Sequence, residues 1–186
     1  MAMAYRERAI LLLEQKLKSV NLRKHCLAVE AIMGELASHF GEPQENWKLS
    51  GLLHDVDYEE TQDRIHLHSQ MASEWLLGEG FPPAVAHAIL VHNQAHGVTA
   101  ETQMERALIY ADALSGLIVA SALVLPSKKI ADLKTENVLR RFKEKSFAKG
   151  VHREEILLCE KDRLTLEEFI SLGIQALQKE SEAIGL

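Results

Sequence analysis

The residue types in this chain best suited to chemistry are its histidines and a few aspartates. The 186 residues include nine histidines, and histidine is the side chain that most often binds transition metals. His54 and Asp55 are adjacent, so one helix end can offer an imidazole nitrogen and a carboxylate to the same cation. This donor combination favours iron, manganese, nickel or zinc over magnesium alone. The pair therefore predicts a metal site, provided that further ligands lie nearby.

Further ligands can be sought by their helical neighbours. A ligand on a helix must point into the protein, so the residues three, four and seven positions away should be apolar or small. The residues that pass this test include His25, His68, His92 and Asp112. Asp112 is the most informative, because a carboxylate on an inward-facing stripe is costly unless a cation or hydrogen-bond donors compensate it. A metal would supply that cation.

The other histidines give a mixed pattern. His39 and His66 have polar neighbours and are predicted at the surface, His96 falls in a predicted loop, and His152 has mixed neighbours. His87 passes the test as well. In a chain this apolar, passing the test is therefore weak support for metal binding by any single histidine. For any one histidine, a hydrogen-bonded core residue is the alternative interpretation.

Helices must position these residues, because the apolar residues recur with a helical period along almost the whole chain. Prolines and glycines fall mainly between the periodic stretches. Thr102 with Glu105, and Thr165 with Glu168, have the spacing of capping boxes and predict two helix starts. The sequence therefore predicts an all-α fold. The predicted helices span residues 5–20, 22–40, 44–55, 66–77, 83–94, 103–125, 136–149, 153–161 and 166–184.

The composition is that of an ordinary globular protein, with 47% hydrophobic and 26% charged residues. We expect one domain over residues 1–186, with a core at about 20–125 and a helical extension at 126–186 packed on it. The N-terminus lacks the layout of a secretory signal, Cys26 and Cys159 make no disulfide framework, and the apolar stretch 113–125 is too short to span a membrane. A cytoplasmic protein without a membrane partner is expected; its oligomeric state is not predicted.

The net charge of −6 argues against a nucleic-acid polymer as partner. Residues 127–153 nevertheless contain nine Lys and Arg against three acids, and this segment could attract a small anion. Lys128 and Lys129 follow Pro126, which could turn the chain back toward Asp112, so these lysines are predicted to bind a substrate phosphate. The alternative is a solvated helix face.

An ordered set of motifs carries a resemblance to a known family. The order is His25, then Leu52-Leu53-His54-Asp55-Val56, His68, His92-Asn93 and Tyr110-Ala111-Asp112-Ala113-Leu114. Over roughly residues 20–125 this resembles the HD superfamily of metal-dependent phosphohydrolases. The resemblance implies a compact HD-domain helical bundle with additional C-terminal helices. It also implies one metal on His25, His54, Asp55 and Asp112, a second metal on His68 and His92, and Asp55 as the bridge between them.

The chain departs from the family pattern in two places. Many two-metal members read His-Asp-Ile-Gly-Lys, whereas this chain continues after His54 and Asp55 with Val56, Asp57 and Tyr58. His92 is followed by Asn93, and no Gly-Tyr-Pro element is present, which argues against a cyclic-di-GMP phosphodiesterase. The acids after the pair, Asp57, Glu59 and Glu60, could supply a general acid or base or could be solvated carboxylates.

The resemblance implies hydrolysis of a phosphate ester by a metal-activated water. The expected cofactors are one or two divalent transition metal ions (Fe, Mn, Ni or Zn), with Asp55 as the catalytic residue and a small phosphorylated metabolite or nucleotide as substrate. Two alternatives stay open: a di-iron oxygenase of the same superfamily, and a non-catalytic metal-binding sensing module.

Overall fold

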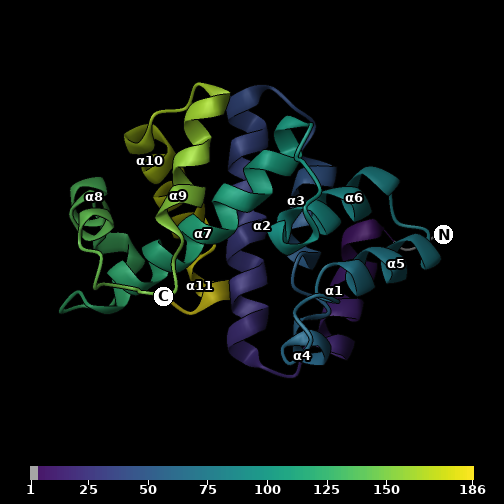
Figure 1. The fold of residues 1–186 in the computed structure, drawn as a ribbon. Helices are drawn as coiled ribbons and strands as arrows, with labels where there is room; N and C mark the ends of the chain where they lie inside the picture. The colour runs from purple at the N-terminus through teal and green to yellow at the C-terminus, as the bar shows by residue number, and fades with distance from the viewer. Residues whose placement is uncertain (1–3) are drawn as a thin grey trace.

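Two 21-residue helices, α2 (Val20–Phe40) and α7 (Gln103–Leu123), cross at the centre of the molecule (Figure 1). The structure, a computed structural model, describes residues 4–186. It is all-α as predicted, and no strand occurs between residues 4 and 186. The remaining elements are α1 (Tyr5–Lys16), α3 (Gln44–Leu53), α4 (Tyr58–Thr61), α5 (Gln70–Gly78), α6 (Pro83–His92), η1 (Gln94–His96), η2 (Ile130–Asp132), α8 (Thr135–Lys143), α9 (Arg153–Ile156), η3 (Leu157–Asp162), α10 (Leu166–Lys179) and α11 (Ser181–Ile184).

Helices α1 and α3 to α6 lie on one side of α2 in Figure 1, and α3 makes its main contact with α2. The two helices approach closely at Gly51. A Cβ atom there would lie 2.8 Å from the backbone oxygen of Val29 and 2.8 Å from the backbone nitrogen of Glu30. Only glycine fits this approach without a shift of the backbone, and the approach holds the end of α3 against α2.

Helices α8 to α11 lie on the other side of α2, where α10 packs against α2, α7 and α8 (Figure 1). The loop between α8 and α9 is closed by Arg153, whose guanidinium donates to the carbonyl oxygens of Phe142, Glu144 and Val151 among others. One hydrophobic cluster contains buried residues from α1 through α11. The C-terminal helices therefore share the core of the helices before them.

Several predicted helix boundaries are wrong. The predicted helix 66–77 begins only at Gln70, so residues 65–69 form turns. The predicted helix 136–149 ends at Lys143, because the following residues fold back into the loop that Arg153 closes. Predicted helices 5–20 and 166–184 also end early, at Lys16 and Lys179. Both capping boxes are confirmed, at Thr102 and Thr165.

Helix α7 is longer than the apolar stretch 113–125 and contains most of it. By length and composition alone it could span a membrane, yet most of its apolar segment is buried inside the protein. It also carries Glu105 and Asp112. Its apolar character thus serves the core, as expected of the central helix of a bundle.

Candidate metal centre

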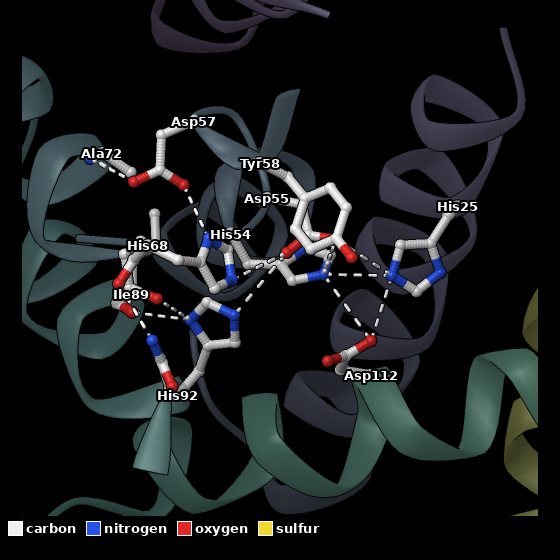
Figure 2. Close-up of polar contacts among 12 residues, drawn as sticks. His25, His54, Asp55, Asp57, Tyr58, His68, Ala72, Ile89, His92 and Asp112 are labelled. Carbon is white, nitrogen blue, oxygen red and sulfur yellow. Dashed lines mark hydrogen bonds and ion pairs between the residues drawn. The ribbon is translucent and has the colours of Figure 1, made fainter. Parts of the chain in front are cut away.

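The structure brings all six predicted ligands together from five parts of the chain (Figure 2). Two project from the long helices: His25 from α2 and Asp112 from α7. His54 and Asp55 occupy the turn directly after α3, and His92 is the last residue of α6. His68 lies in the turn before α5, whereas the test of its helical neighbours assumed that it lies on a helix.

Four ligand atoms form the first set, and their separations suit a single metal. His25 Nε2 lies 3.1 Å from His54 Nε2 and 3.0 Å from Asp112 Oδ1. Asp55 Oδ2 lies 3.6 Å from His25 Nε2 and 3.5 Å from His54 Nε2. Two ligands about 2.1 Å from one metal, at right angles or at the tetrahedral angle, are about 3.0 to 3.4 Å apart. The side chains therefore fit a divalent metal with little adjustment.

The second set uses the other oxygen of Asp55. Asp55 Oδ1 lies 3.3 Å from His68 Nε2 and 3.7 Å from His92 Nε2. These three residues offer ligand atoms that all lie within 4.8 Å of one another. One carboxylate thus faces both sets, with Oδ2 toward the first and Oδ1 toward the second, which is the arrangement that a bridging ligand needs.

The four imidazoles are held by hydrogen bonds at their other nitrogen, Nδ1. The Nδ1 partners are oxygens in every case: Ser115 Oγ for His25 at 3.2 Å, Gly51 O for His54 at 2.8 Å, Asp57 Oδ1 for His68 at 2.8 Å and Ile89 O for His92 at 2.6 Å. The hydroxyl of Ser115 itself donates to the Asp112 carbonyl oxygen, so it accepts from His25. Protonated Nδ1 atoms leave the four Nε2 lone pairs directed at the centre, as metal ligation requires.

The carboxylates of Asp55, Asp57 and Asp112 give the centre an affinity for positive charge. Burial alone would lower the pKa of His54, but Asp55 and Asp112 raise it to about 9. Burial likewise opposes protonation of His68, and Asp55 and Asp57 raise its pKa to about 9. Burial would raise the pKa of Asp55, yet His54, His68 and His92 hold it well below its usual range. The site thus holds positive charge strongly, and a metal can take the place of the protons.

Asp57 contributes to the site in a way that the sequence does not reveal. Its side chain is fully buried, with Oδ1 accepting from His68 Nδ1 and Oδ2 accepting from the Ala72 backbone N–H at 2.9 Å (Figure 2). The interpretation as a solvated carboxylate is therefore wrong for Asp57. Glu59 and Glu60 are nearer the surface: Glu59 accepts from the backbone N–H groups of Lys18 and Ser19, and Glu60 pairs with Lys16.

Asn93 holds the turn that carries His68. Its Nδ2 donates to the carbonyl oxygens of Ile65, at 3.1 Å, and His68, at 3.0 Å, and His96 Nε2 donates to the His68 oxygen at 2.6 Å. Ser69 follows with a φ of 71°, a strained value for a residue with a side chain. The hydrogen bonds of Asn93 and His96 offset this strain and fix His68 relative to the end of α6.

The remaining histidines behave largely as predicted. His39 and His66 are exposed. His87, whose helical neighbours are also apolar or small, is half exposed. Its Nδ1 lies 2.7 Å from Glu105 Oε1, away from the six ligands.

Lys128 and Lys129 are not brought to the centre. Both are exposed and follow the end of α7. In the described part of the chain neither forms an ion pair or hydrogen bond with any of the six ligand residues. Asp112 and Leu123 alone are about 16 Å apart along the straight helix. The role of Lys128 and Lys129 in phosphate binding stays a prediction.

The centre is open on one side only. The side chains of His54, His68 and His92 are 0%, 7% and 5% exposed, whereas those of His25 and Asp112 are 26% and 34% exposed. A small molecule can therefore reach the ligand atoms from the side of α2 and α7.

Comparison with known proteins agrees with this geometry. The family model of the HD domain matches residues 22–117, a segment that contains all six ligand residues. Neither the curated proteins nor the solved structures gave a match. Because the matched segment covers more than half of the chain and its histidines and aspartates converge as that family's motif order implies, this chain belongs to the HD domain family.

Proposed function

We propose that this HD-domain protein is a metal-dependent phosphohydrolase that cleaves the phosphate ester of a small phosphorylated compound. HD domains are mostly those of metal-dependent hydrolases, and the His/Asp cluster here can hold a divalent metal. The observation that supports the proposal most is the position of Asp55, whose two oxygens face two ligand sets. Two cations held close together suit the charge of a phosphoryl group.

His25, His54, Asp55 and Asp112 would hold the first metal, and His68, His92 and the other oxygen of Asp55 the second. Mixed imidazole and carboxylate ligands favour iron, manganese, nickel or zinc. When bound, such a metal supplies Lewis-acid chemistry, making water acidic enough to act as a nucleophile near neutral pH and neutralising phosphoryl charge.

The protein's own residues prepare this chemistry in two ways. The oxygens at the four Nδ1 atoms fix the imidazole planes before any ligand arrives, so little reorganisation is needed. The buried side formed by His54, His68 and His92 keeps bulk water away, whereas the open side at His25 and Asp112 admits substrate. Asp55 is the catalytic residue of this proposal, because both ligand sets depend on it.

Phosphate release from a panel of phosphomonoesters tests the proposal. Purified protein loaded separately with Mn, Fe, Ni or Zn should release phosphate from at least one compound, and Asp55→Ala should abolish the release. His66→Ala is the matched control, because His66 is exposed and outside the centre. A fully metal-loaded protein that releases no phosphate from any compound would overturn the proposal, and oxygen uptake by the iron form would point to oxidation instead.

A further inference from the structure

A cavity of about 300 Å³ lies beside His25, one of the two exposed ligand residues. Helix α2 supplies Asn21, Lys24, His25 and Ala28 to its lining. Helix α7 supplies Gly116, Val119 and Leu123, and the C-terminal turn around Ile184 closes it. The cavity is therefore a hollow between the two central helices, covered at one end by α11.

His25 belongs to both the cavity and the first ligand set. On α7, Gly116, Val119 and Leu123 follow Asp112 by four, seven and eleven residues, so they share its helix face. The α7 part of the lining begins at Gly116, one turn beyond Asp112, and runs to Leu123, about 10 Å along the helix. A phosphoryl group at the ligands would leave the remainder of an ester pointing into this space.

The residues that line the cavity favour an apolar organic group in the ester. Ala28 and Ile184 are buried, Val119 is partly buried and Leu123 forms an exposed rim. Apart from His25, the polar side chains are those of Asn21 and Lys24. A sugar would leave several hydroxyl groups buried without partners, which is costly, and no Phe, Tyr or Trp is present to stack on a nucleobase.

The cation at the cavity is Lys24. Its side chain lies against Gly185, and among residues 4–186 it forms no ion pair. An ammonium group without a carboxylate partner favours an anionic ligand over a neutral one of the same shape.

We propose that this cavity binds the organic group of the substrate and that this group is a short apolar chain or small ring, so the substrate is the phosphomonoester of an apolar alcohol. The inference rests on the proposed function, which it narrows. The apolar group contacts Ala28, Val119, Leu123 and Ile184. The ammonium group of Lys24 pairs with the phosphate of the substrate.

Titration calorimetry of the metal-loaded protein with alkylphosphonates from methyl to hexyl, whose carbon–phosphorus bond ester hydrolysis does not cleave, tests the apolar contact. Affinity should rise about three- to fourfold per methylene until the cavity is full. Val119→Trp, which fills the cavity, should make the series flat. Val124→Trp is the matched control, because Val124 is exposed and outside the lining, and it should keep the parent's slope. Should Val119→Trp fail to fold, Leu123→Ser at the exposed rim should still reduce the slope.

Lys24→Met tests the charge separately, since it keeps the apolar stem and removes the ammonium. It should weaken every member of the series by a similar factor, methylphosphonate included, whereas Lys18→Met outside the cavity should not. A flat series in the parent protein, or equal slopes in the two tryptophan variants, would overturn the inference; equal effects of the two lysine changes would overturn the role of Lys24.

Phosphate release measured on alkyl phosphates of the same chain lengths keeps the two proposals apart. Release without dependence on chain length supports hydrolysis and contradicts the cavity. Binding that depends on chain length without release supports the cavity and contradicts hydrolysis.

Discussion

The open half of the metal centre and its closed half are built from different kinds of structure. His25 projects from the second turn of α2 and Asp112 from the middle of α7, and the backbones of both helices are fixed by their own hydrogen bonds and by the core. In the closed half, His54, Asp55 and His68 lie in turns and His92 is the last residue of α6, so these ligands depend on neighbours for their position. The helical half is exposed and can meet a substrate, whereas the half built on turns is buried and anchored by Gly51, Asp57 and Asn93.

This difference predicts how each half fails. Removing a ligand on a long helix should remove that ligand alone, because the helix persists without it. Removing an anchor of a turn should displace a ligand without touching it.

The largest effect is expected from Asp55→Ala, because Asp55 is the residue that the two ligand sets share. Both metals should be lost. The decrease in metal affinity should exceed the roughly 10- to 100-fold decrease that follows removal of a residue that only hydrogen-bonds to a ligand. Metal content per chain after gel filtration measures this, with His66→Ala as control. A variant that keeps one metal at full affinity would show that the two sets are independent.

The next effect is expected from Asp57→Asn, which touches only the closed half. Asp57 accepts from His68 Nδ1 and from the Ala72 amide, so the change should weaken the second metal by roughly 10- to 100-fold and leave the first unaffected. Metal titration of the variant should show one tight equivalent where the parent shows two. Glu60→Gln, an acid at the surface three residues away, is the matched control; equal losses from both variants would contradict the assigned role of Asp57.

A smaller effect on the site, but a measurable one on stability, is expected from Gly51→Ala. The added Cβ would lie 2.8 Å from the α2 backbone, and overpacking of this kind costs about 1 to 3 kcal/mol. The melting temperature should fall by roughly 3 to 10 °C in a chain of this size. Gly78→Ala is the control, since nothing lies within 4 Å of its Cβ position; a matching decrease there would show that the close approach is not the cause.

The same contrast explains what could be predicted from sequence. His25 and Asp112 lie on long amphipathic helices, where spacing reports direction, so their inward orientation follows from their neighbours alone. His68 is brought to the site although the helix assumed for it begins two residues later. Its orientation depends on Asp57 and Asn93, and no periodic signal links residues that meet only after the chain has turned. The cavity at Lys24 likewise depends on how α11 returns to α2.

The smallest effect is expected from replacing both Lys128 and Lys129 by Ala. The sequence predicts that they bind the substrate phosphate, which would raise KM on their removal while leaving metal content intact. The structure places them beyond Leu123, which is already about 16 Å along the helix from Asp112. That distance exceeds the Debye length of about 8 Å at physiological salt, so direct attraction there is screened. We therefore expect a modest rise in KM at low salt, where charges act over about 30 Å at 0.01 M, and none at physiological salt. Lys24→Met should raise KM under both conditions, because Lys24 lines the cavity beside His25. A large rise in KM for the double variant at physiological salt would mean that residues 124–134 fold over the centre when substrate binds.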